Sequence, residues 1–262
     1  IDAVFVVGGA GHDFDFARLE MLKLLAEDER SRARVFEDYD SARVALEDAD
    51  FLITYTCNVL ASVETQEALR AFVVGGKRWY ALHGTNSVLR FLSPEGGDYG
   101  DLLVDAPRWA PLLMETLGSL LVAHPPIAPY RVNVVQPEHP MLEGVTPFDT
   151  SDELYLLETY GELDVLLDCE FEGEATGFVE KDWQKARHPV MYFKPHGEGA
   201  VLFLTLGHCR GHYDLPGVAV YYPEIERCAW ELPVFYTLLR RGIDWAKAPT
   251  LMEAPPDSNT VV

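Results

Sequence analysis

Hydrophobic residues in the first part of the chain alternate between strand-like and helix-like patterns. Residues 3–7 form a continuous apolar run that ends at a glycine pair, as expected of a strand buried on both faces. Apolar residues then recur at helical spacing from Phe16 to Ala26, with charged residues between them. The alternation continues, with strands predicted at 33–36, 50–55 and 78–83 and helices at 41–46 and 64–74. Strands separated by helix-length segments predict βαβ units, and therefore a parallel sheet covered by helices on both faces.

The rest of the chain is less regular and predicts an added antiparallel portion. Residues 96–111 are rich in Gly, Pro and Asp, which favours a loop. The turn Gly197-Glu198-Gly199 predicts a hairpin between the strands that flank it. Strands are expected at 130–135, 154–157, 165–167, 190–193 and 200–206, and a closing helix at 233–246. We therefore predict one α/β domain over residues 1–248 and an extended C-terminal tail over 249–262.

Charge and composition narrow the choice of partners. The chain has 42 acidic and 21 basic residues and a formal net charge of −21. Because nucleic acids and anionic membranes are bound through clustered Lys and Arg, neither is an expected partner. No apolar run approaches the roughly 20 residues of a spanning helix, and the start of the chain lacks a signal-peptide layout. We expect a cytoplasmic protein, with a homo-oligomer left open.

Three histidines each follow a predicted strand. His12 follows the first, His83 the fourth and His208 the last. A single histidine at such a point most often makes a hydrogen bond in a turn. Parallel strands, however, gather their carboxyl ends at one edge of a sheet, where ligands bind, so we expect at least two of these histidines to share a pocket. The acidic candidates are Asp13, beside His12, and Glu153, at the predicted start of the strand 154–157.

The turn at His83 has the layout of a nucleophile elbow. An apolar strand leads into His83, and small residues beginning with Gly84 follow. An imidazole is a poor acyl-transfer nucleophile beside a cysteine thiolate, so two other chemistries stay open. His12, His83 and His208 with a carboxylate could hold a divalent metal such as zinc. Alternatively, His83 and His208 could act with Glu153 as an acid–base set for enolisation or glycosidic cleavage.

Other polar motifs favour a structural interpretation. Residues 8–11 resemble a phosphate-binding turn but lack the GxGxxG register and the Walker lysine. His124 and His139 each precede a proline and are predicted to be structural turn residues. Tyr55 is expected in the core.

An ordered set of short segments resembles the ThuA-like (trehalose utilisation) family of the class I glutamine amidotransferase-like superfamily. The segments run in the family's order over nearly the whole chain: residues 6–14, 79–84, 124–125, 138–145, 152–155, 188–200, 206–208 and 232–246. The resemblance implies one flavodoxin-like α/β domain with an extra antiparallel portion, and a role in carbohydrate metabolism. Two features depart from the family's pattern: Cys209 replaces the usual Asp after the late Gly-His, and residues 96–109 match no family motif.

The resemblance also assigns roles to residues. The superfamily's glutaminases carry cysteine at the elbow, where this chain has His83, so glutaminase activity is expected to be absent. The family's recurrent polar positions correspond to His12, His83, Glu153 and His208, which we expect to be catalytic in an enzyme acting on a sugar or keto-sugar derivative. Near the same edge, substrate contacts are expected from Asp13, Asn58, Asn86 and Tyr213. The alternative is a non-catalytic sugar-binding or regulatory module on the same fold.

Overall fold

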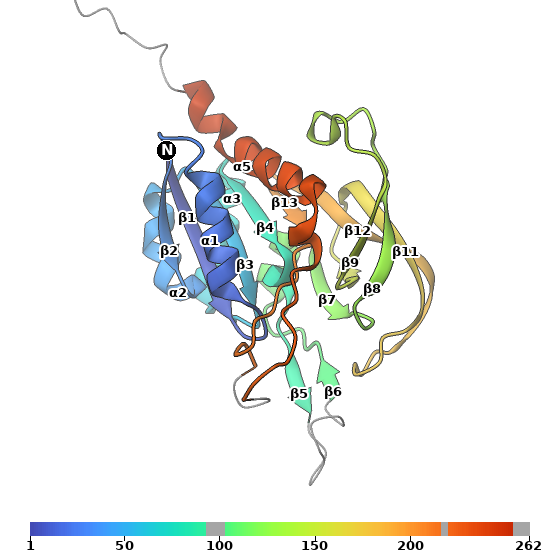
Figure 1. The fold of residues 1–262 in the computed structure, drawn as a ribbon. Coiled ribbons are helices and arrows are strands. Elements are labelled where there is room, and N and C mark those ends of the chain that lie inside the picture. The colour runs from blue at the N-terminus through green and yellow to red at the C-terminus, as the bar shows by residue number, and fades with distance from the viewer. Residues whose placement is uncertain (93–102, 216–219, 254–262) are drawn as a thin grey trace, which may run out of the picture.

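The computed structural model describes residues 1–92, 103–215 and 220–253. Within these residues the main sheet has nine strands in the order β2-β1-β3-β4-β13-β12-β11-β8-β9 (Figure 1). The first five strands of this order are parallel: β2 (Arg32–Phe36), β1 (Asp2–Gly9), β3 (Phe51–Cys57), β4 (Arg78–Leu82) and β13 (Gly199–Leu204). The remaining four pair antiparallel: β12 (Asp182–His196), β11 (Asp164–Glu174), β8 (Ala128–Val134) and β9 (Phe148–Asp152). The predicted parallel sheet with an antiparallel addition is confirmed.

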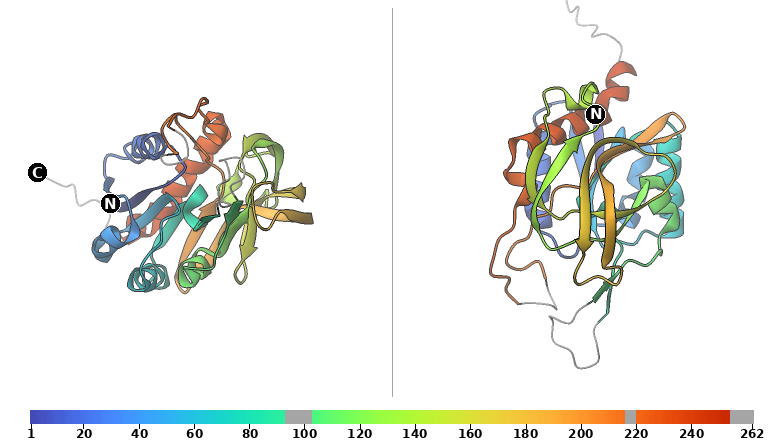
Figure 2. Two further views of the ribbon diagram at one scale, coloured as in Figure 1. Left: turned by 90° about the horizontal axis from the view of Figure 1, so that it is seen from below. Right: turned by 90° about the vertical axis from the view of Figure 1, so that its right-hand side faces the viewer.

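Helices cover both faces of the parallel part (Figure 2). One face carries α1 (Phe14–Leu25) and α5 (Pro233–Glu253), and the other carries α2 (Tyr39–Ala42), α3 (Val63–Val74) and α4 (Pro111–Leu117). Successive side chains of β1 alternate between the two cores, because strand residues point to opposite faces: Phe5 packs on the side of α1, and Val4 and Val6 on the side of α3. The continuous apolar run of β1 therefore reflects burial on both faces.

Short elements complete the fold. Two small sheets pair β7 (Ser119–Ala123) with β10 (Leu156–Thr159), and β5 (Arg90–Leu92) with β6 (Leu103–Asp105). The 3₁₀ helices are η1 (Arg43–Asp48), η2 (His83–Asn86), η4 (Pro140–Leu142) and η5 (Cys228–Glu231). Among the described residues, no helix is both long and apolar enough to cross a membrane.

Several predicted boundaries are wrong. The expected helix 41–46 begins earlier, because Asp38 caps α2 by accepting a hydrogen bond from the Ser41 backbone N–H, and it continues as η1. The expected strand 154–157 is β10, at Leu156–Thr159, so Glu153 lies between β9 and β10 instead of opening a strand. Part of the expected loop 96–111 is β6, and residues 93–102 lie outside the described residues.

The closing helix also runs further than predicted. It continues through Pro249 to Glu253, whereas a tail was expected from 249; residues 254–262 lie outside the described residues. Proline lacks the N–H that would bond to the carbonyl four residues earlier, which here is that of Trp245. Arg78 donates to this Trp245 carbonyl from its guanidinium, which also lies 4.9 Å from the centroid of the Trp245 ring. The arginine replaces the missing helical hydrogen bond, so Pro249 is tolerated.

Candidate metal centre

The turn after β4 holds His83 in a strained conformation. His83 has φ +44°, a left-handed value that is uncommon for any residue other than glycine. A Cβ at Gly84 would lie 2.6 Å from the Thr56 carbonyl oxygen, so only glycine fits directly after the histidine. The strained residue followed by an obligatory glycine confirms the elbow layout. It places a fully buried imidazole at the carboxyl edge of the parallel strands.

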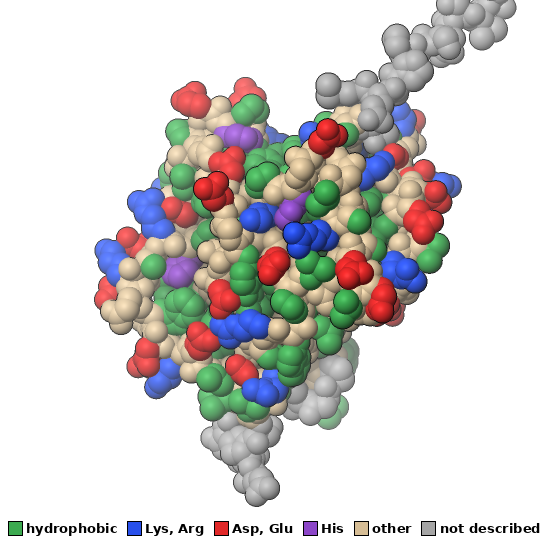
Figure 3. All heavy atoms as spheres, turned by 180° about the vertical axis from the view of Figure 1, so that it is seen from behind, with side chains coloured by type: hydrophobic (Ala, Val, Ile, Leu, Met, Phe, Trp, Pro, Cys, Tyr) green, Lys and Arg blue, Asp and Glu red, His purple; other side chains and the backbone are tan. Residues whose placement is uncertain are grey.

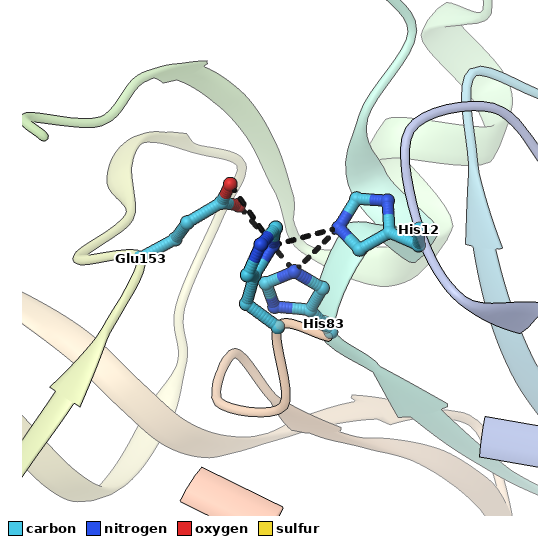
Figure 4. Close-up of side chains that lie close together, drawn as sticks. His12, His83 and Glu153 are labelled. Atoms are coloured by element: carbon cyan, nitrogen blue, oxygen red, sulfur yellow. Dashed lines mark hydrogen bonds and ion pairs between the residues drawn. The ribbon is translucent and has the colours of Figure 1, made fainter. Parts of the chain in front are cut away.

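Three further side chains meet His83 at this edge. His12 follows β1, His208 follows β13 and Glu153 follows β9, and one ligand atom from each of the four residues lies within 4.8 Å of all the others. Figure 4 shows His12, His83 and Glu153 pointing toward one another from separate segments. The shortest nitrogen–nitrogen distances run from His12 Nε2 to His83 Nε2 (2.9 Å) and to His208 Nδ1 (3.3 Å). Glu153 approaches with Oε1 at 3.0 Å from His208 Nδ1 and Oε2 at 3.4 Å from His83 Nε2. The prediction that these histidines share a site is confirmed.

Hydrogen bonds outside the cluster assign the histidine tautomers. His83 Nδ1 lies 2.8 Å from the Thr205 carbonyl oxygen, and His12 Nδ1 lies 3.3 Å from the Ala10 carbonyl oxygen. A carbonyl oxygen can only accept, so both Nδ1 atoms carry a proton. If both rings were neutral, two Nε2 lone pairs would face each other across 2.9 Å, so this contact requires either a proton on one Nε2 or a metal cation between the two.

The donor set fits a divalent metal. Three imidazoles and one carboxylate are the ligands that zinc commonly takes in proteins. All four residues are buried, and three imidazoles that converge with one carboxylate could hold such an ion. His12, His83, His208 and Glu153 would hold the ion, with His12 and His83 binding through Nε2 and His208 through Nδ1.

Burial and mutual contacts shift the pKa values of the cluster. Burial, followed by repulsion from His83 and His208, holds the pKa of His12 well below its usual value. Burial opposes the charged form of Glu153, but attraction to His124 and His208 outweighs it and lowers the pKa of this carboxyl well below normal. Burial likewise opposes the charged form of His208, yet Glu153 and Glu226 raise its pKa to about 9. Without a metal, the cluster therefore keeps a protonated His208 between two carboxylates.

Three residues that sequence reasoning did not assign to the site also contact it. The Tyr155 hydroxyl lies 3.1 Å from His83 Nε2, and Glu226 Oε2 lies 2.8 Å from His208 Nε2. His124, expected to be a structural turn residue, instead places Nε2 3.6 Å from Glu153 Oε1. It follows the apolar strand β7, so the strand-end signal that identified the other histidines also applied to it. Glu226 carries no comparable signal, because it lies in an irregular segment.

The expected substrate-binding residues divide into two groups. Asp13 and Tyr213 line a hollow of about 250 Å³ that also includes His12, and Tyr213 is 74% exposed. Asn58 and Asn86 make hydrogen bonds within the protein. Asn58 has φ +58° and accepts a hydrogen bond from the Leu89 backbone N–H at 2.8 Å. Asn86 is fully buried and donates to Ser119 Oγ at 2.6 Å, while its Oδ1 has no hydrogen-bond partner among the described residues.

The sheet order and the elbow after β4 define a flavodoxin-like α/β protein with an imidazole in the elbow position. The sequence model of the ThuA family, described as trehalose utilisation, matches residues 3–221. The chain belongs to this family.

Solved structures agree with this fold. A ThuA-like protein from Parabacteroides merdae ATCC 43184 is 17% identical, with a TM-score of 0.62 over 98% of this chain and 93% of that chain. A ThuA-like protein from Bacteroides uniformis ATCC 8492 is 14% identical, with a TM-score of 0.64 over 94% of this chain and 91% of that chain. A β-galactosidase from Rahnella sp. R3 is 13% identical, with a TM-score of 0.54, and the match covers 97% of this chain but only 31% of that enzyme. At these identities the likeness concerns the fold alone. No curated protein matches the chain at a significant level.

Proposed function

We propose that this protein is a metal-assisted enzyme that acts on an uncharged sugar or keto-sugar derivative. The observation that carries the proposal is the buried cluster of His12, His83, His208 and Glu153, in which His12 Nε2 lies 2.9 Å from His83 Nε2. The description of the family as trehalose utilisation supports a carbohydrate substrate. A divalent cation held there would act as a Lewis acid on a carbonyl or hydroxyl oxygen of the sugar.

The side chains around the cluster support proton handling. Tyr155 is buried, and its hydroxyl lies 3.1 Å from His83 Nε2, where it can donate to or accept from a group on the substrate. His124 lies beside Glu153 and is partly exposed, so it can pass a proton between the buried cluster and solvent. Glu153 supplies negative charge to the site, with Oε1 3.0 Å from His208 Nδ1.

The hollow beside His12 favours an uncharged substrate. Three carboxylates belong to its lining, those of Asp13, Asp15 and Asp214, and no Lys or Arg does among the described residues. Asp13 pairs with Arg227 at 2.9 Å and Asp15 with Arg18 at 3.2 Å, which reduces their negative charge. The charge of Asp214 remains to disfavour a sugar phosphate or a sugar acid, and the carboxylates would accept hydrogen bonds from sugar hydroxyls. The exposed ring of Tyr213 offers a flat apolar face for a sugar ring. On the face shown in Figure 3, basic side chains are scattered among acidic ones.

The elbow of this protein offers no nucleophile for glutaminase activity. It carries His83, and Cys57 and Cys209 are buried, while Cys228 is partly buried. Burial raises the pKa of the Cys57 and Cys209 thiols to about 12 and raises the pKa of the Cys228 thiol as well, so none of the three is a thiolate at neutral pH.

Elemental analysis of the purified protein tests the proposal. We expect about one zinc or other divalent ion per chain in the wild type after dialysis against metal-free buffer. His83→Ala should lose the ion, because it removes a central ligand. His139→Gln is the matched control: His139 does not belong to the cluster, packs against Phe193 and accepts from the Met141 backbone N–H, so the metal content of this variant should equal that of the wild type.

A turnover assay distinguishes the metal-assisted enzyme from the acid–base enzyme and from the non-catalytic module. The metal-loaded protein should convert neutral keto-sugars or glycosides and leave the corresponding sugar phosphates unchanged. A wild type that binds no metal even after incubation with zinc would refute the metal-assisted reaction. The protonated His208 between Glu153 and Glu226 would then favour the acid–base set, provided that turnover is found. Sugar binding without turnover would instead favour the non-catalytic module.

A further inference from the structure

The segment from Cys209 to Cys228 contacts the cluster through one carboxylate, that of Glu226. Arg210 and Glu226 form an isolated antiparallel bridge, with both backbone N–H···O hydrogen bonds at 2.9 Å. This pairing holds the backbone of Glu226 opposite Arg210, which lies two positions after His208. The segment is therefore anchored beside the cluster at both ends.

The Glu226 side chain reaches His208 from the side opposite Glu153. Its Oε2 lies 2.8 Å from His208 Nε2, and its Oε1 accepts from the Tyr222 hydroxyl at 3.0 Å. Arg210 Nε lies 3.4 Å from the same Oε2. An ionised carboxylate only accepts, so His208 carries a proton on Nε2, and a metal ion at the cluster would take the place of the proton on Nδ1, which faces His12 and Glu153.

His208 differs in this respect from the other two histidines. His83 and His12 are oriented by the backbone carbonyls of Thr205 and Ala10, whereas His208 is oriented by a charged side chain. A carboxylate behind a ligating imidazole fixes its tautomer and increases its basicity as a ligand, and losing such a partner typically weakens metal binding about 10–100-fold.

We propose that Glu226 is a positioning residue that orients His208 through Nε2 and thereby sets the metal affinity of the cluster. This inference rests on the proposed metal site. Among the described residues, Glu226 contacts the cluster at His208 Nε2, and it lines a separate hollow of about 430 Å³ instead of the hollow beside His12, so its effect on the cluster is expected through His208.

A purely structural role for Glu226 makes a different prediction. If the carboxylate served only to pair with Arg210 and hold the segment in place, Arg210→Ala should weaken metal binding as much as Glu226→Ala. If Glu226 acts through His208, Arg210→Ala should have the smaller effect, because it leaves the contact between Glu226 and His208 in place.

Zinc affinity, measured by competition with a chromogenic chelator, tests the inference on the folded full-length chain. We expect Glu226→Ala to weaken zinc binding by about 10–100-fold. Glu226→Gln should weaken it less, because the amide oxygen can still accept from His208 Nε2. The control Glu224→Ala, an exposed residue of the same segment, should bind as the wild type does. Circular dichroism of each variant verifies folding, and Glu226→Gln remains informative if the alanine variant does not fold.

The outcomes separate the two proposals. A wild type that binds no zinc refutes the metal site, and the role of Glu226 with it. Tight binding by the wild type together with unchanged affinity in Glu226→Ala refutes only the role of Glu226. Equal weakening by Arg210→Ala and Glu226→Ala also refutes it, in favour of the structural role.

Discussion

Asp152 connects the strand that precedes Glu153 to the turn that carries His208. Its carboxylate is buried and accepts from four backbone N–H groups. Oδ1 accepts from Glu153 at 2.8 Å and His208 at 3.1 Å, and Oδ2 accepts from Gly207 at 2.9 Å and Ala229 at 3.1 Å. We predict that Asp152→Asn, which preserves the shape of the side chain, substantially destabilises the protein.

The magnitude follows from this geometry. Asparagine replaces one of the two oxygens with an NH₂ group, so two backbone donors lose their acceptor whichever way the amide is turned. Each buried donor left unsatisfied costs about 1–3 kcal/mol. Part of this loss is offset, because burial raises the pKa of Asp152 and the neutral amide avoids the cost of burying a charge. We therefore expect the free energy of unfolding to fall by about 2–4 kcal/mol.

Equilibrium unfolding in urea measures this change. Asp149→Asn is the matched control, since Asp149 lies on the same strand with an exposed side chain 3.2 Å from Arg131. The control should change the free energy of unfolding by no more than about 0.5 kcal/mol. If Asp152→Asn lost less than about 1 kcal/mol, the four N–H contacts would not be stabilising and the reasoning would be wrong.

Three further predictions concern the elbow, a buried histidine and the metal. Gly84→Ala places a Cβ 2.6 Å from the Thr56 carbonyl oxygen, so it should cost about 1–3 kcal/mol, and an unchanged melting temperature would contradict the close approach. Burial lowers the pKa of His188 below 6.5. The stability that this residue contributes as a neutral group should therefore be lost as the pH falls below 6.5. The free energy of unfolding of His188→Phe should vary less between pH 7.5 and 5.5 than that of the wild type. A chelator should lower the melting temperature of the wild type by several degrees but leave that of His83→Ala unchanged, whereas equal shifts would exclude a stabilising ion at the cluster.

The local pattern of polar and apolar residues was sufficient to predict the parallel half of the fold. Strands β1, β3 and β4 are buried on both faces, so their apolar runs are continuous and easily recognised. Parallel strands joined by helices bring their carboxyl ends to one edge, and this rule predicted that at least two of His12, His83 and His208 meet; the structure brings all three together.

The antiparallel half was predicted less well. The strand expected at 165–167 extends over Asp164–Glu174, and the one expected at 190–193 extends over Asp182–His196. The additional residues are largely exposed and include many charged side chains, so their strand conformation depends on cross-strand pairing rather than on their own hydrophobicity.

The sequence by itself determined the order of the buried strands and helices. It also determined that histidines lie at the strand ends and that an imidazole replaces a thiol at the elbow. Each of these features depends on residues that are neighbours in the chain. Only the tertiary structure decided which nitrogens face one another, that Glu226 and Tyr155 contact the cluster, and that Asn86 donates to Ser119. These contacts join residues far apart in the chain. Their distances depend on how the sheet and the returning segment pack, and no local pattern of polar and apolar residues specifies that packing.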